Sequence, residues 1–160
     1  MVERLLVVED SKPIATVIKQ IAKALEYEVT IATTLAQVEE ILQGGAKFFA
    51  ATIDYSLPDA PSGEAIDCVL SHGIPGVVLT GKMDEDTRQK ILSLPVIDYI
   101  PKENTQAFLY LKRVLHWQKT NQSNGILVVD DSSSARNHVV ELLKRRNFSV
   151  FVAGNGVHAM

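Results

Sequence analysis

The chain has few of the features that would tie it to an oxidising compartment, a membrane or nucleic acid. It holds one cysteine, Cys68, so no internal disulfide can form, which fits a reducing cytoplasm. No apolar run approaches the roughly 20 residues that cross a bilayer, and the start, with a glutamate before a short apolar run, is unlike a signal peptide. A net charge of -3 gives no basic surface for nucleic acid. We therefore expect a cytoplasmic α/β protein without direct membrane or nucleic-acid contacts.

Short apolar runs alternate with segments of helical periodicity. The runs predict strands at residues 5–8, 29–32, 49–53, 77–79 and 97–100. Helices are expected over residues 12–25, from Leu35 to the Gly44-Gly45 pair, around Ala65 to Leu70, over residues 84–93 and from near Thr105. Ser11 is expected to cap the first helix. Five strands alternating with five helices predict a doubly wound parallel sheet, covered on both faces, over residues 1–117.

The same pattern begins again after residue 117. Residues 118–124 are polar and aperiodic, which is typical of a linker. Beyond them, Leu127 repeats Leu6 and Asp131 repeats Asp10, each 121 positions later (127 − 6 and 131 − 10). Residues 125–160 are therefore expected to form a strand, a helix and a second strand, a partial second copy. These residues are too few for a whole domain of this class, so we expect either a fragment of a longer protein, which we favour, or a half-domain covered by another chain.

Polar residues follow the predicted strands at their carboxyl ends, where open α/β sheets bind ligands. Glu9-Asp10 follow the first strand and Asp54 the third, while Thr80 ends the fourth and Lys102 follows the fifth. In a flavodoxin-like sheet of order 2-1-3-4-5 the first and third strands are neighbours, so three carboxylates converge. Such a cluster needs a cation, and hard oxygen ligands suit Mg²⁺. Beside a lysine and a hydroxyl, Asp54 is a candidate nucleophile for phosphoryl transfer.

With these residues in place, the chain resembles the receiver domain of two-component response regulators, of the chemotaxis type. The resemblance covers residues 4–117 and includes the acid pair, the phosphoacceptor with the following Tyr-Ser-Leu-Pro, the switch hydroxyl and the lysine. In this sequence the matching positions are Glu9, Asp10, Asp54, Tyr55, Ser56, Leu57, Pro58, Thr80, Gly81 and Lys102.

The resemblance also implies roles that spacing alone does not give. Tyr99 matches the family's switch aromatic, and the backbone carbonyl of Ser56 matches its third protein ligand to Mg²⁺, with Mn²⁺ as an alternative ion. Residues 125–160 resemble the opening of a second receiver, with Asp130 and Asp131 as its acid pair.

Two departures from the family pattern surround the site. Glu103 follows Lys102 where the family has a proline joined through a cis bond, and Pro101 precedes it, which leaves the geometry of the peptide after Lys102 open. The glycine after the phosphoacceptor comes one residue late, at Gly63, so this loop has an extra residue. Neither departure removes a catalytic group.

The function expected from the resemblance is a phosphoacceptor in a phosphorelay. A histidine kinase or phosphotransfer protein would phosphorylate Asp54 with Mg²⁺, and movement of Thr80 and Tyr99 would repack the surface of the fourth helix, fifth strand and fifth helix. That surface would meet another receiver or an output domain, such as a cyclic-di-GMP synthase, and a homodimer is an option. As an enzyme the receiver would catalyse only its own phosphorylation and dephosphorylation.

The sequence leaves two alternative classes of function. One is a non-phosphorylated receiver-like module that works by dimerisation, which the missing Lys-Pro bond favours. The other is a nucleotide-binding domain or an aspartate-based phosphatase, and it is disfavoured. Glu-Asp-Ser-Lys-Pro stands where a Gly-x-Gly-x-x-Gly loop or an Asp-x-Asp pair would be needed.

Overall fold

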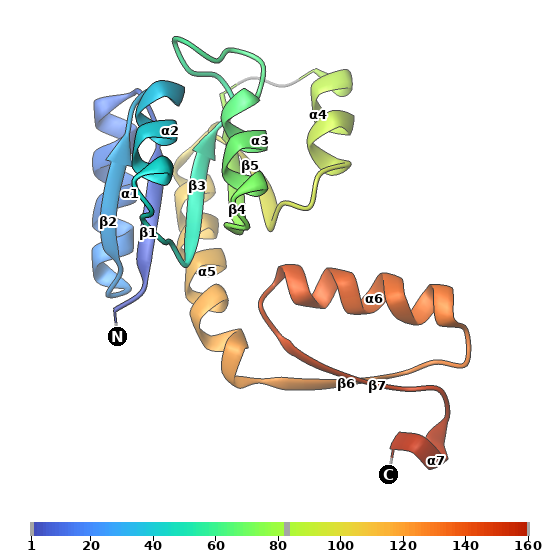
Figure 1. Ribbon diagram of the computed structural model, residues 1–160. Coiled ribbons are helices and arrows are strands. Elements are labelled where there is room, and N and C mark those ends of the chain that lie inside the picture. The colour runs from blue at the N-terminus through green and yellow to red at the C-terminus, as the bar shows by residue number, and fades with distance from the viewer. Residues whose placement is uncertain (1, 82–83, 160) are drawn as a thin grey trace. The chain divides into compact units, whose positions relative to one another are not determined.

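The computed structural model describes residues 2–81 and 84–159 (Figure 1). The chain divides into two compact units, Met1–Arg113 and Val114–Met160. None of the helices in the described part of the chain is long and apolar enough to cross a membrane.

The first unit is built on a five-stranded parallel sheet. Its strands are β1 (Arg4–Val8), β2 (Glu28–Ala32), β3 (Ala50–Asp54), β4 (Gly76–Thr80) and β5 (Asp98–Pro101). Their order is β2-β1-β3-β4-β5, which confirms the predicted flavodoxin-like sheet. The register pairs Val8 with Ile53 and Thr80 with Pro101. Residues that follow β1, β3, β4 and β5 are therefore brought to one edge of the sheet.

Helices cover both faces of this sheet. They are α1 (Lys12–Ala24), α2 (Leu35–Gln43), α3 (Glu64–Ser71), α4 (Glu85–Leu92) and α5 (Thr105–Thr120), close to the predicted bounds. Leu6 and Val8 of β1 join buried residues of α2 and α3 in one hydrophobic core. Figure 1 shows α1 and the beginning of α5 on the opposite face. Burying β1 and β3 on both sides explains why their sequences are almost continuously apolar.

Three local expectations need correction or completion. Ser11 stands at the N-cap of α1, but its side chain makes no capping hydrogen bond; its backbone N–H donates to the Glu9 carboxylate. The segment expected to be a polar linker has helical backbone over most of its length: residues 118–120 are the end of α5, and Asn121–Ser123 form a 3₁₀ helix, η1. No cis peptide occurs among the described residues, so the peptide after Lys102 is trans.

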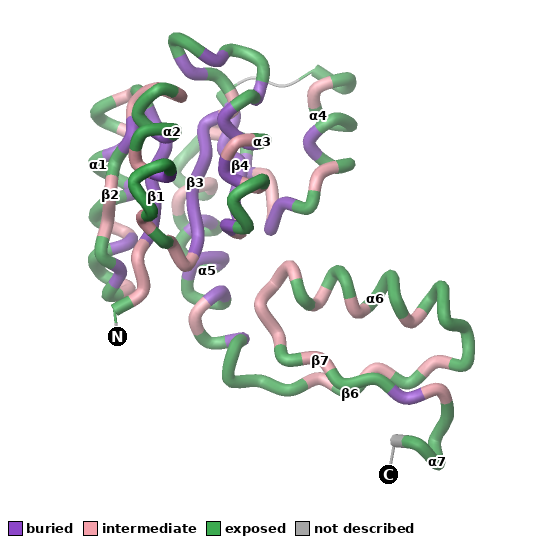
Figure 2. Tube along the Cα trace, in the orientation of Figure 1, coloured by how far each residue is buried: buried purple, intermediate pink, exposed green. Residues whose placement is uncertain are grey.

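The second unit repeats the opening topology of the first. After η1 come β6 (Gly125–Val129), α6 (Ser133–Arg145), β7 (Ser149–Ala153) and the short helix α7 (Gly156–Ala159). β6 pairs with β7 in parallel, as β1 pairs with β2. Figure 2 shows that these two strands are mostly exposed or half-buried, whereas β1, β3 and β4 of the first unit are mostly buried. The expected strand-helix-strand repeat is therefore present, with α7 in addition.

Candidate functional site

The ends of the strands fix the site residues through backbone hydrogen bonds to neighbouring strands. The N–H of Glu9 donates to the carbonyl of Ala32 at 2.9 Å, which extends the pairing of β1 with β2 by one residue. The N–H of Lys102 donates to the carbonyl of Thr80 at 2.8 Å, so the lysine begins where β4 and β5 end. The carboxyl ends of the strands thus hold the backbone of all four site residues in place, rather than mobile loops. These residues are Glu9, Asp54, Thr80 and Lys102.

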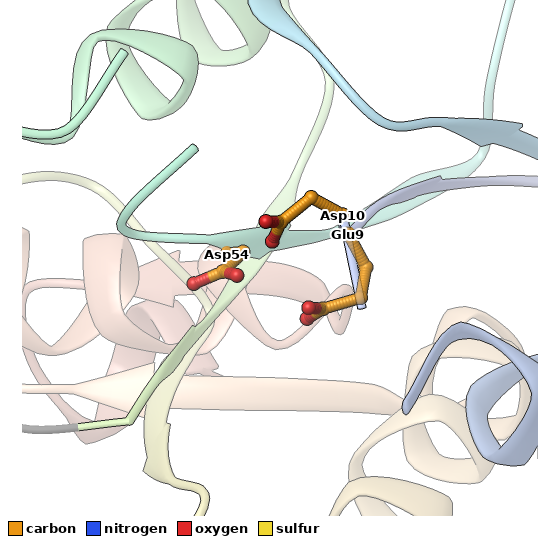
Figure 3. A group of neighbouring side chains, drawn as sticks. All are labelled: Glu9, Asp10 and Asp54. Atoms are coloured by element: carbon orange, nitrogen blue, oxygen red, sulfur yellow. The ribbon is translucent and has the colours of Figure 1, made fainter. Parts of the chain in front are cut away.

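Three carboxylates meet at this edge. Glu9 and Asp10 reach it from the end of β1, and Asp54 reaches it from the end of β3 (Figure 3). One oxygen of each lies within 4.8 Å of the others. Glu9 and Asp54 are buried and Asp10 is exposed, so the cluster opens to solvent on the side of Asp10. The predicted convergence of the carboxylates is therefore what the fold produces.

Lys102 lies between the two buried carboxylates. Its Nζ donates to Glu9 Oε2 at 2.7 Å and lies 3.0 Å from Asp54 Oδ2. The second oxygen of Glu9 accepts from the N–H of Ser11 at 3.2 Å, and the second oxygen of Asp54 accepts from the N–H of Ser56 at 3.2 Å. Because the lysine side chain is only 8% exposed, water does little to screen these two ion pairs.

The site carries more negative than positive charge. Three carboxylates and one ammonium leave a surplus of two negative charges when all are ionised (3 − 1). Burial raises the pKa of Glu9, the hydrogen bond from Lys102 lowers it, and the charge of Asp54 raises it further, with a net upward direction. A divalent cation would cancel the surplus, and clustered carboxylate oxygens are the donors that Mg²⁺ and Mn²⁺ prefer. The residues present therefore fit such an ion.

An open cavity of about 510 Å³ lies beside Asp54. Thr80 and Lys102 contribute to its wall, as do Tyr55 and Gly81 of the matched motif positions. Three further lining residues, which the sequence did not indicate as site residues, are Pro61, Asp84 and Thr87. The cavity is large enough to admit a phosphoryl group and part of its donor, since a phosphoryl group is much smaller than the ligands of typical pockets of this size.

The remaining predicted residues of the first unit lie around this cavity or behind it. Ser56 lines the cavity. Thr80 is buried at the end of β4. Tyr99 is half-buried on β5, opposite Val78 of β4, and its hydroxyl accepts a hydrogen bond from Arg88 Nε at 2.9 Å. No pattern in the sequence indicated the Arg88 contact, because it joins a helix and a strand through side chains alone.

The loop with the extra residue is fixed to the helices on either side of it. Both carboxylate oxygens of Asp59 accept from the first turn of α2, from Leu35 N at 2.8 Å and Ala36 N at 3.0 Å. Lys90 Nζ of α4 donates to the carbonyl of Ser62 at 2.9 Å. The loop therefore has a defined conformation next to the cavity, which its length alone did not predict.

The second acid pair, Asp130 and Asp131, has no third carboxylate beside it among the described residues, unlike Glu9 and Asp10. Asp130 Oδ1 accepts from the N–H of Ser132 at 2.8 Å, the counterpart of the bond from Ser11 to Glu9. Asp131 is exposed. Within the described ranges, Glu9, Asp10 and Asp54 form the only group of three or more potential metal ligands, so Asp130 and Asp131 have no third partner there.

Comparisons with known proteins extend these observations. No family model matches the sequence, and no curated protein matches it. A solved two-component system response regulator/GGDEF domain protein is 34% identical, with a TM-score of 0.86, over 98% of this chain and 64% of its own. This chain thus spans about two thirds of that protein's solved length.

Other solved structures match the first part of the chain. A CheY-like receiver domain protein from Methanospirillum hungatei JF-1 is 26% identical, with a TM-score of 0.63, over 75% of this chain and 98% of its own. The Mn²⁺-bound form of the response regulator Rcp1 is 23% identical, with a TM-score of 0.62, over 70% of this chain and 91% of its own. The solved structures that this chain resembles are thus response regulator receivers, and the chain has their fold.

Proposed function

We propose that Asp54 is the phosphoacceptor of this receiver and that a phosphohistidine on a kinase or phosphotransfer protein is its donor. The observation that carries the proposal is the placement of Lys102 Nζ 3.0 Å from Asp54 Oδ2 beside an open cavity. A carboxylate oxygen of Asp54 attacks phosphorus, an O–P bond forms, and the P–N bond to the donor imidazole breaks. The imidazole leaves with the electron pair of that bond and takes up a proton.

The residues around Asp54 are proposed to stabilise the phosphoryl group during that transfer, each in a different way. The Lys102 ammonium neutralises charge on a phosphoryl oxygen, and the Thr80 hydroxyl donates a hydrogen bond to another. Asp10, Asp54 and the Ser56 carbonyl would hold Mg²⁺ or Mn²⁺, with Glu9 completing the acidic set. When bound, the ion supplies further neutralisation of the phosphoryl charge. The Mn²⁺-bound Rcp1 structure, a protein of the same fold, supports this assignment.

Phosphorylation is proposed to act on the surface of α4, β5 and α5. The new phosphate contacts favour a state in which Thr80 and Tyr99 lie closer to the site, which shifts a population between two arrangements of this surface. Exposed Leu92 of α4 and Leu109 of α5 give the surface apolar positions for a receiver or output partner. The relative's GGDEF domain suggests a cyclic-di-GMP synthase output for the whole protein, acting in the cytoplasm.

We further propose that residues 125–160 are the opening of a second receiver, after a junction at residues 118–124. Leu127 and Val129 of β6 are 48% and 47% exposed, whereas their counterparts Leu6 and Val8 of β1 are 0% and 1% exposed. In the first unit, residues of α2, α3 and β3 share a core with Leu6 and Val8. The open face of β6 and β7 therefore has the composition of a receiver core.

Incubation with Mg²⁺ and acetyl phosphate, followed by intact-protein mass spectrometry, tests the phosphoacceptor. The wild-type chain is expected to gain the mass of one phosphoryl group, Asp54→Asn to gain none, and Asp67→Asn, an exposed acid on α3, to gain as much as wild type. No gain in wild type, or an equal gain in Asp54→Asn, contradicts the proposal. Tight Mg²⁺ binding without any phosphoryl gain would instead support the non-phosphorylated module.

A further inference from the structure

Tyr99 and Arg88 join β5 to α4 through a side-chain hydrogen bond. Arg88 Nε donates to the Tyr99 hydroxyl at 2.9 Å, while the rest of the guanidinium reaches Glu85 at 3.5 Å. The bond to Tyr99 is the shorter of the two and has a charged donor, which makes it stronger than a bond between neutral groups. The Tyr99 hydroxyl is therefore held at the α4 side of β5.

The acid next to Tyr99 is engaged elsewhere. Asp98 accepts from the N–H of Tyr99 at 2.8 Å and from the hydroxyl of Tyr110 on α5. The Asp98 side chain thus contacts Tyr110 of α5, whereas Arg88 of α4 donates to the Tyr99 hydroxyl. The two side chains adjacent in β5 thus point to different helices, Asp98 to α5 and Tyr99 to α4.

Polar contacts carry much of the attachment of α4. Ile91 is the single buried side chain of this helix in the part of the chain that the structure describes. The other fixed points are the Arg88 bond to Tyr99 and the Lys90 bond to the Ser62 carbonyl. A helix with so little buried apolar surface is among the elements that rearrange most easily.

We propose that Arg88 is a positioning residue that holds Tyr99 against α4 and so sets the balance of the receiver's switch. The consequence for switching rests on the function proposed above. To approach Thr80, the Tyr99 ring must leave the Arg88 guanidinium, so the Arg88 bond favours the unphosphorylated arrangement. By linkage, a change that removes this bond favours the other arrangement and strengthens binding of a phosphoryl group at Asp54 by the same factor.

The experiment uses the full chain labelled with 3-fluorotyrosine and followed by ¹⁹F NMR. The chain has four tyrosines, and the Tyr99 resonance is assigned from Tyr99→Phe. Without any phosphoryl analogue, Arg88→Ala is expected to move the Tyr99 resonance. Arg88→Lys, which keeps the charge but lacks the Nε donor, is expected to do the same. Arg113→Ala, a change at an exposed arginine of α5, is expected to leave it in place. An unmoved resonance in Arg88→Ala overturns the proposal.

The second arm adds Mg²⁺ and beryllofluoride, an analogue of the phosphoryl group. Arg88→Ala is expected to lower the half-saturating concentration of the analogue about fivefold, the lower end of typical coupling between sites. In the Tyr99→Phe background the same change is expected to have no effect, because the hydroxyl is already gone. An equal effect in both backgrounds overturns the proposal. If no variant takes up the analogue, the phosphoacceptor function fails, and the first arm still decides whether Arg88 positions Tyr99.

Discussion

Thr52 is the clearest case of a single side chain that works against the stability of the first unit. It is fully buried on β3, and its hydroxyl has no hydrogen-bond partner among the described residues. A buried hydroxyl that is desolvated and unpaired costs about 1–3 kcal/mol. Thr52→Val keeps the shape and removes the polar atom, so we expect the free energy of unfolding to rise by about 1 kcal/mol.

Urea denaturation followed by circular dichroism measures this change. Thr16→Val is the matched control, because the Thr16 hydroxyl lies on α1 and donates to the Lys12 carbonyl at 2.8 Å. The control is expected to be neutral or slightly destabilising. A loss of stability in Thr52→Val would mean that the buried hydroxyl has a partner that stabilises it.

Gly63 is required by its conformation and by its neighbour. Its φ of +85° is one that other residues rarely adopt, and an added Cβ would stand 2.8 Å from Cε2 of the Tyr55 ring. Gly45 has a similar φ of +82° but open space around it. Both Gly→Ala changes carry the cost of the left-handed conformation, about 1–2 kcal/mol. Only Gly63→Ala also displaces Tyr55, so urea denaturation should show the larger loss of unfolding free energy for Gly63→Ala, and equal losses would contradict the close contact.

At the scale of residues, sequence identified the groups that the fold brings to the sheet edge but not the contacts between side chains. Glu9, Asp10 and Asp54 could be placed together because they follow strands whose neighbours are set by topology. Arg88 and Asp59 act through hydrogen bonds to residues 11 and 24 positions away, between elements whose relative rotation no local pattern specifies. Their roles could be read only from the structure.

At the scale of elements, α2 depends on a loop that is distant in sequence. Thr34 caps its first turn locally, and Asp59 accepts from Leu35 N and Ala36 N. These backbone hydrogen bonds hold the pKa of Asp59 below its usual value. A carboxyl whose pKa is lowered by folding contributes stability above its ordinary pKa of 3.8, and the contribution is lost as the pH falls through the lower folded value.

We expect Asp59→Ala to lower the urea midpoint at pH 7. At about pH 2 the variant should differ much less from wild type, because Asp59 of the wild type is then largely protonated and neither protein carries a negative charge at this position. Asp59→Asn, which keeps one oxygen acceptor, is expected to fall between them at pH 7. Glu40→Gln, an exposed change near the other end of α2, serves as the control. A difference between wild type and Asp59→Ala that stays constant from pH 7 to pH 2 would show that the carboxylate charge is not involved.

The bounds of most elements followed from the sequence because apolar periodicity and caps mark them. α4 begins at Glu85 after the cap of Asp84, within the predicted range. The helical backbone of residues 118–123 did not follow from the sequence. These residues are polar and lack an apolar stripe, which is typical of a linker, yet residues 118–120 continue α5 and Asn121–Ser123 form η1. Asn121 donates to the Arg146 carbonyl and Asn147 donates to the Gln118 carbonyl, so contacts with the turn after α6 stabilise this stretch.

At the scale of the whole molecule, the internal repeat gives a comparison of the same position in two settings. Leu6 and Leu127 occupy equivalent places in β1 and β6, but Leu6 is buried among residues of α2 and α3, while Leu127 belongs to the open face of β6 and β7. The free energy that a leucine contributes depends on the surface it removes from water. The repeat should therefore be nearly symmetric in topology and strongly asymmetric in stability.

Leu6→Ala is expected to destabilise the first unit by about 3 kcal/mol, the usual cost of removing a buried leucine side chain. Leu127→Ala is expected to cost the second unit less than about 1 kcal/mol, because half of the side chain already meets solvent. Amide hydrogen exchange followed by mass spectrometry reports both units at once, through peptides that cover β1 and β6. Equal loss of protection in the two variants would show that the face bearing Leu127 is buried in solution. Repeating the exchange at lower protein concentration would then identify what buries it: contacts with a second chain are lost on dilution, whereas contacts within the same chain are not.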